Sequence, residues 1–93
     1  MANVKVIMPS IIASVTRGEK EVRVSAYNLG EVVKELIKKY GDDFKDRILD
    51  DEGKPRRLLS FFINGKNAKF LKEFETPLKD GDEIFILPTV SGG

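Results

Sequence analysis

Apolar and polar residues alternate in two short stretches near the start of the chain. In NVKVIM, Val4, Val6 and Met8 fall on one face of an extended segment. EVRVSA repeats the alternation with Val22 and Val24. A period of two is typical of a β-strand with one buried face. The intervening TRGEK contains a glycine that can adopt the positive φ of a turn, so we expect the two strands to form a β-hairpin.

The apolar period changes in NLGEVVKELIKKYG to the three- and four-residue steps of an α-helix. The apolar face comprises Leu29, Val32, Val33, Leu36, Ile37 and Tyr40. Asn28 can cap the first turn, with Glu31 returning a hydrogen bond, and Gly41 can end the helix with a positive φ. The next stretch, DDFKDRILD, begins with aspartates suited to a helix start and predicts a short second helix.

The second half of the chain alternates turn residues with strand formers. Residues 50–57 combine turn residues with charges and predict an exposed connection. LLSFFI follows as a strand, and Asn64-Gly65 indicates a tight hairpin turn to a short partner strand at residues 67–70. KDGD at residues 79–82 predicts one more turn before the last strand, EIFILP.

The expected order is strand, strand, helix, strand, short strand, strand. This order indicates the α+β class, with a mixed four- to five-stranded sheet packed on one main helix and a short second helix. The sheet residues expected to face the helix are Val4, Val6, Val22, Val24, Leu59, Phe61, Ile63, Ile84 and Ile86.

Phe62, Phe85 and Leu87 fall on the opposite face of the same strands. Partner interfaces favour aromatic anchors, so these three residues are candidates for partner docking. If the strand register were shifted by one residue, they would belong to the core instead. Lys5 and Ile7 lie on the second face of the first strand.

Composition narrows the chemistry that the chain can perform alone. Its 93 residues include no Cys and no His. Thiolate nucleophiles, the usual zinc ligands and the commonest acid–base group near neutral pH are therefore missing. We expect a single domain that is not itself an enzyme.

The charges are nearly balanced, with sixteen basic and fifteen acidic residues and a net charge of +1. This balance argues against nucleic acid as a partner. The sequence shows neither a secretory signal nor a long apolar span, so we expect no membrane association and a cytoplasmic location. Arg56 and Arg57 are interpreted either as solubilising charges or as contacts to an acidic partner.

The sequence closes with ILPTVSGG. We expect the domain to occupy residues 1–88 and a flexible tail to occupy residues 89–93. Gly92 and Gly93 lack Cβ atoms and can enter a narrow channel, and five extended residues span about 16 Å. Such a tail can carry its terminal α-carboxylate into the active site of another protein.

The chain resembles the ubiquitin-like sulfur carriers of the MoaD/ThiS family, which have the β-grasp fold. The resemblance spans nearly the whole length and rests on VKVIMPS, NLGEVVKELIKKY, FFINGK, TPLKDGDEIFILP and the closing VSGG. The IMPS near the start and ILPTVSGG are most similar to carriers that supply sulfur for cysteine synthesis. The small subunit of molybdopterin synthase is the next most similar group.

The resemblance implies that the reactive group is the carboxylate of Gly93. An E1-like adenylating enzyme would activate this carboxylate with ATP and Mg, neither of which the carrier binds itself, before its conversion to a thiocarboxylate. Val90, Ser91 and Gly92 would enter the partner's active site. The sulfur acceptor would be a PLP-dependent cysteine synthase or, alternatively, the large subunit of molybdopterin synthase.

Two other functions stay open at this point. A ubiquitin-like modifier would join Gly93 to lysines of other proteins after the same adenylation. A plain binding module would use the sheet and have no terminal chemistry.

Overall fold

The computed structural model describes residues 1–89. The strands are β1 (Ala2–Ile7), β2 (Glu21–Ala26), β3 (Leu59–Ile63), β4 (Lys66–Asn67) and β5 (Glu83–Pro88). The α-helices are α1 (Leu29–Tyr40) and α2 (Asp42–Ile48), and short 3-10 helices occupy Ser10–Val15 (η1), Ala68–Phe70 (η2) and Glu73–Glu75 (η3).

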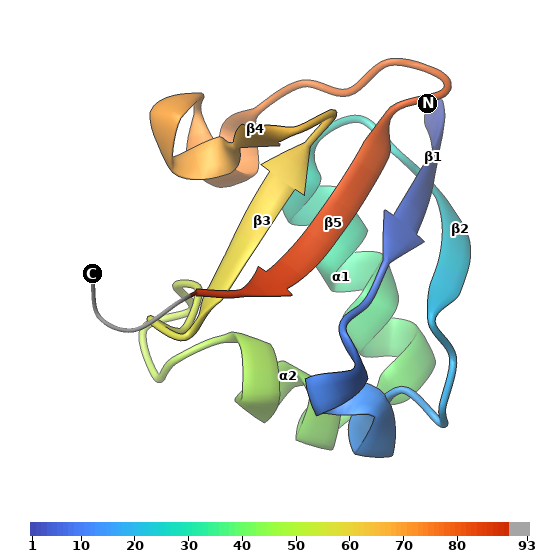
Figure 1. Cartoon of the computed structure of the whole chain (residues 1–93). Coiled ribbons are helices and arrows are strands. Elements are labelled where there is room, and N and C mark those ends of the chain that lie inside the picture. Colours follow the sequence, from blue (N-terminus) through green and yellow to red (C-terminus); the bar gives the residue numbers. More distant parts are fainter. Residues whose placement is uncertain (90–93) are drawn as a thin grey trace.

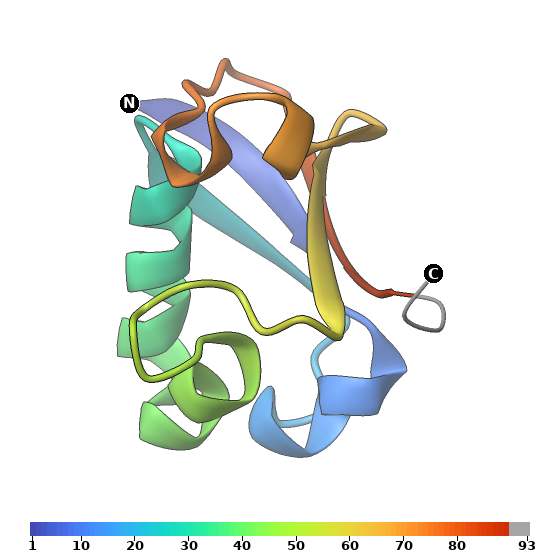
Figure 2. The same cartoon turned by 90° about the vertical axis from the view of Figure 1, so that its left-hand side faces the viewer.

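The five strands form one mixed sheet in the order β2-β1-β5-β3-β4. β5 runs parallel to β1 and antiparallel to β3, while β1–β2 and β3–β4 are antiparallel pairs. Helices α1 and α2 lie on one face of this sheet, and neither covers the other face (Figures 1 and 2). The predicted α+β fold, a mixed sheet on one main helix, is confirmed. Among residues 1–89, no helix has the length and hydropathy that a membrane span requires.

Helix α1 begins and ends where the sequence predicts. The Asn28 side chain accepts a hydrogen bond from the Glu31 N–H at 2.9 Å, and Gly41 ends the helix with a φ of 92°. The Glu31 carboxylate accepts a hydrogen bond from the N–H of Tyr27, one residue before the cap, at 2.7 Å. Both ends therefore satisfy backbone groups that a helix leaves unpaired.

The core lies between the sheet and α1, and its members are those that the alternation predicts. Val6, Ile84 and Ile86 are completely buried, and Val22 and Val24 are half-buried against the same cluster. The helix contributes the buried residues Leu29, Val32, Val33 and Leu36. α2 adds Phe44 and Ile48, which are also completely buried.

Two connections differ from the prediction. β1 and β2 do pair as a hairpin, but residues 8–20 contain η1 rather than a simple turn, because Ile12 is buried in the core and draws the chain inward. The partner strand expected at 67–70 is only Lys66–Asn67. The Asn67 side chain accepts a bond from the N–H of Lys69 at 3.0 Å, which starts η2 in place of further strand.

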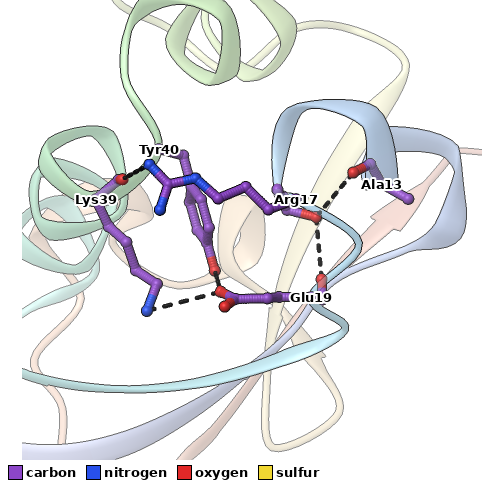
Figure 3. Close-up of polar contacts among 6 residues, drawn as sticks. Ala13, Arg17, Glu19, Lys39 and Tyr40 are labelled. Carbon is purple, nitrogen blue, oxygen red and sulfur yellow. Dashed lines mark hydrogen bonds and ion pairs between the residues drawn. The ribbon is translucent and has the colours of Figure 1, made fainter.

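A polar cluster joins the connection after η1 to the last turn of α1 (Figure 3). The Tyr40 hydroxyl donates to Glu19 Oε1 at 2.6 Å, and Lys39 Nζ lies 3.6 Å from the same oxygen. Arg17 donates to the backbone carbonyl of Lys39 at 3.2 Å. Cations and donors at this position satisfy carbonyls at the helix C-terminus.

The cluster shifts the pKa values of two of its groups in opposite directions. The hydrogen bond from Tyr40, followed by the charge of Lys39, lowers the pKa of Glu19. Burial, followed by the bond to Glu19, raises the pKa of the Tyr40 hydroxyl. A lowered carboxyl pKa stabilises the fold above the unfolded value of 4.5, and this contribution disappears as the pH falls through the folded pKa.

We expect Tyr40→Phe to lower the melting temperature at pH 7, because Glu19 loses its donor. The difference from wild type should shrink as the pH falls from about 4.5 through the lowered folded pKa of Glu19, below which Glu19 is protonated in both states. Thermal unfolding followed by circular dichroism from pH 3 to 8 measures this, with Tyr27→Phe as control because Tyr27 is 61% exposed. A Tyr40→Phe deficit that is equal at pH 3 and pH 7 would contradict the assignment.

Candidate partner-binding site

The last strand leaves the sheet beside the loop that precedes β3. Pro88 is opposite Leu59 in the β3–β5 pairing. The N–H of Thr89 donates to the Leu58 carbonyl at 2.9 Å, and its hydroxyl donates to the Arg57 carbonyl at 2.8 Å. Thr89, which the sequence assigns to the tail, is thus bound to residues 57 and 58. The other tail residues of the prediction, Val90, Ser91, Gly92 and Gly93, lie outside the described residues.

The sheet face turned away from α1 brings the three predicted docking residues together. Phe62 and Phe85 are register partners on β3 and β5, and Leu87 lies two residues farther along β5. Both phenylalanines are half-buried, whereas Leu87 is 38% exposed. The alternative that they are core residues is wrong, because their neighbours Phe61, Ile84 and Ile86 occupy the core. Their role in docking stays a prediction.

A fourth apolar residue belongs to this face and is missing from the predicted site. Ile7 of β1 is the parallel register partner of Phe85 and is half-buried. The alternation in NVKVIM already places Ile7 on the second face, so the signal is present in the sequence. We call Ile7, Phe62, Phe85 and Leu87 the outer-face strip.

An ion pair closes one end of the outer-face strip. Lys5 and Glu83 are neighbours on β1 and β5, and their side-chain charges lie 3.3 Å apart. Both side chains are partly exposed, so the pair adds little stability. It does keep two charges satisfied beside an apolar surface that is available to a partner.

The carboxyl and hydroxyl groups with shifted pKa values lie outside the outer-face strip. Besides the Glu19–Tyr40 cluster they include Asp50, whose carboxylate accepts hydrogen bonds from the N–H groups of Lys54 and Glu52 in a surface turn. These bonds lower the pKa of Asp50. Within residues 1–89, no group of three or more His, Cys, Asp or Glu side chains could hold a metal ion. The outer-face strip offers an apolar contact surface next to the end of β5.

A model of the ThiS family matches residues 9–93. The chain belongs to the ThiS family. This confirms the resemblance drawn from the motifs, and the match extends across the residues beyond Thr89. "Sulfur carrier protein CysO" of Mycobacterium tuberculosis is 34% identical over 93 residues, covering 98% of this chain and 99% of the relative.

Solved structures of related proteins share the β-grasp architecture. A chain in the crystal structure of the Amycolatopsis orientalis BexX/CysO complex superposes with a TM-score of 0.84 at 31% identity, covering 97% of this ThiS-family chain and 99% of that one. Small archaeal modifier protein 1 from Methanosarcina acetivorans gives a TM-score of 0.79 at 33% identity, with coverage of 100% and 98%. The predicted β-grasp fold is therefore confirmed.

Truncating a side chain should destabilise the protein more on the core face of β5 than on its outer face. Ile86→Ala should destabilise the protein by about 2–5 kcal/mol, because it leaves a cavity in the core. Leu87→Ala removes the same kind of side chain from a partly exposed position and should cost less than half as much. Urea unfolding of both variants tests the assignment, and equal losses would show that the register of β5 is wrong.

Proposed function

We propose that this protein is a sulfur carrier, and that the α-carboxylate of Gly93 is adenylated by a partner enzyme and converted to a thiocarboxylate for cysteine biosynthesis. The observation that carries the proposal is the nearly complete match to a protein named sulfur carrier, at 34% identity over 93 residues. The family match, which runs through residue 93, supports a role for the terminal glycine.

The proposed chemistry needs no catalytic group from the carrier. A carboxylate oxygen of Gly93 bonds to the α-phosphorus of ATP, held with Mg by an E1-like enzyme, and pyrophosphate leaves. Sulfide from a donor then attacks the acyl carbon, the bond to the AMP oxygen breaks, and AMP leaves. The product is a thiocarboxylate, whose sulfur can attack an electrophilic carbon on the acceptor enzyme.

The fold contributes position and affinity. Thr89 is bound to the Leu58 and Arg57 carbonyls, so the reach of the tail into a partner is measured from this residue. Phe85 and Leu87 of the outer-face strip lie on β5, the strand that ends there. A partner that binds Phe62, Phe85 and Leu87 therefore holds the start of the tail at a defined distance from the partner's active site.

Incubation with a cognate adenylating enzyme, Mg-ATP and a sulfide source should replace one oxygen of the chain by sulfur. Intact-mass spectrometry should show an increase equal to the mass difference between the two atoms, located in the C-terminal peptide. A semisynthetic chain that ends in the carboxamide of Gly93 is the matched control, since it keeps every side chain and cannot be adenylated. An unchanged wild-type mass, with an enzyme that modifies another carrier in parallel, would refute the proposal.

Phe85→Asp should weaken binding to the adenylating enzyme by about tenfold or more, since it places a charge in the centre of the outer-face strip. Binding is measured by calorimetry, and circular dichroism checks the fold. Lys38→Glu is the control, because its side chain is 77% exposed on α1. Unaltered binding by Phe85→Asp would exclude the strip as the docking surface and leave the terminal chemistry untouched.

A protein modifier is the second candidate, and the likeness to small archaeal modifier protein 1 favours it. A modifier would use the same adenylate, but a lysine amine would displace AMP and form an isopeptide bond. Isopeptide-linked adducts in cells would support this alternative. Sulfur transfer to a PLP-dependent cysteine synthase, or instead to the large subunit of molybdopterin synthase, would identify the carrier's acceptor.

A further inference from the structure

In the part of the chain that the structure describes, strand β3 has an open edge over most of its length. β4 pairs only with Phe62 and Ile63, whereas β5 pairs with all of Leu59–Ile63. Within residues 1–89, therefore, residues 59–61 have a neighbouring strand on one side only, and the other side lies between η2 and the loop before β3 (Figure 1). At about 3.3 Å per residue, this open edge is roughly 10 Å long.

The hydrogen bonds to β5 show which backbone groups face that edge. The Leu58 carbonyl accepts a hydrogen bond from Thr89, and the Asn64 N–H donates to Glu83. The backbone N–H and C=O groups of the even-numbered residues are therefore directed toward β5. In an antiparallel pair the direction of these backbone groups alternates from residue to residue. The N–H and C=O groups of Leu59 and Phe61 therefore point toward the open edge. The N–H of Leu59 donates to the Arg56 carbonyl at 3.0 Å. A new strand would meet the carbonyl of Leu59 and the N–H of Phe61.

A groove of about 1070 Å³ runs along this edge and includes residues from both faces of the sheet. Leu29 and Phe74 line it on the helix side, and Phe62 and Leu87 line it on the outer side. A strand added to β3 would place alternate side chains on these two faces. The groove thus has the shape that strand addition requires, rather than that of a pocket on one face.

The groove is basic although the whole chain is nearly neutral. Lys54, Arg56, Arg57 and Lys69 line it, against one acidic residue, Glu73. Within residues 1–89, no carboxylate lies within ion-pair distance of Arg57 or Lys69. Arg57 belongs to the loop before β3 and Lys69 to η2, which lie at opposite ends of the open edge (Figure 1).

Exposed apolar side chains accompany the charges. Leu58, at the start of the edge, is 71% exposed, and Phe70 of η2, next to Lys69, is 78% exposed. Lys69 Nζ lies 5.4 Å from the centre of the Phe70 ring. A partner segment would therefore need apolar residues as well as negative charges.

We propose that the groove beside β3 binds an extended acidic segment of a partner protein, which adds a strand to Leu59–Phe61 while its carboxylates meet Arg57 and Lys69. The open backbone edge favours an extended peptide over a helix. The local charge favours acidic residues, and the near-zero net charge argues against a nucleic acid.

The probe is a terminally blocked octapeptide of alternating valine and glutamate, titrated into the full chain and followed by two-dimensional NMR of the backbone amides. Shift changes should concentrate at residues 57–61 and 67–74, and hydrogen exchange at the Phe61 amide should slow. The same peptide with N-methylated valines should not bind, and a valine–lysine octapeptide should bind at least about tenfold more weakly. Higher salt should weaken binding of the glutamate peptide.

The double variant Arg57→Glu with Lys69→Glu should weaken binding of the glutamate peptide by about tenfold, as expected when exposed attractive charge pairs become repulsive. Lys34→Glu with Lys38→Glu, on the exposed side of α1, is the matched control and should bind normally. Equal affinity for both octapeptides, shift changes confined to β2 and α1, or tighter binding of octathymidylate than of the glutamate peptide would each overturn the proposal.

This inference stands apart from the proposed terminal chemistry. Peptide binding at β3 does not use the Gly93 carboxylate, and a chain shortened to residues 1–89 should bind the octapeptide equally well. Loss of binding in the shortened chain would show that residues beyond Thr89 form the site, which contradicts the proposal. Thiocarboxylate formation can succeed or fail without changing either result.

Discussion

The central position of β5 is the constraint on which the rest of the structure depends. β5 lies between β1 and β3, although β1 and β5 come from opposite ends of the sequence. Val6 and Ile84 are register partners across this junction, and both are completely buried. Bringing together two strands so far apart in the sequence costs chain entropy before any contact between them forms. The strand that completes the core is therefore also the strand that brings Thr89 to the surface.

The register of β5 is fixed at both ends by polar contacts. At its start, Asn64 exchanges two bonds with Glu83, at 2.8 and 2.9 Å, and donates to Asp82 at 2.8 Å. At its end, Thr89 is bound to residues 57 and 58. A slip by one residue would break both sets and exchange the core face for the outer face. The outer-face strip is thus specified by the same contacts that specify the core.

The sequence predicts what depends on local periodicity. The faces of α1 and β5 follow from the spacing of their own apolar residues, and the orientation of Phe62, Phe85 and Leu87 follows with them. The conformation of residues 8–20 does not, because it depends on α2: Arg47 donates to the Ile11 carbonyl at 2.8 Å, and Ile12 is buried in the common core. The open edge of β3 could not be predicted from local periodicity either, because it arises where the chain turns away from the sheet after Asn67.

The two candidate binding surfaces have different physical characters, which would matter under the proposed function because a carrier meets more than one partner. The outer-face strip is apolar and its nearby charges, Lys5 and Glu83, satisfy each other, so it supplies affinity with little dependence on salt. The groove beside β3 carries cations without carboxylate partners among the described residues and exposes backbone groups, so it discriminates by charge and by chain conformation. Phe62 and Leu87 border both surfaces. Under the proposed function, partners that share the strip would compete for it near Thr89, and the groove would be the surface by which the protein distinguishes between them.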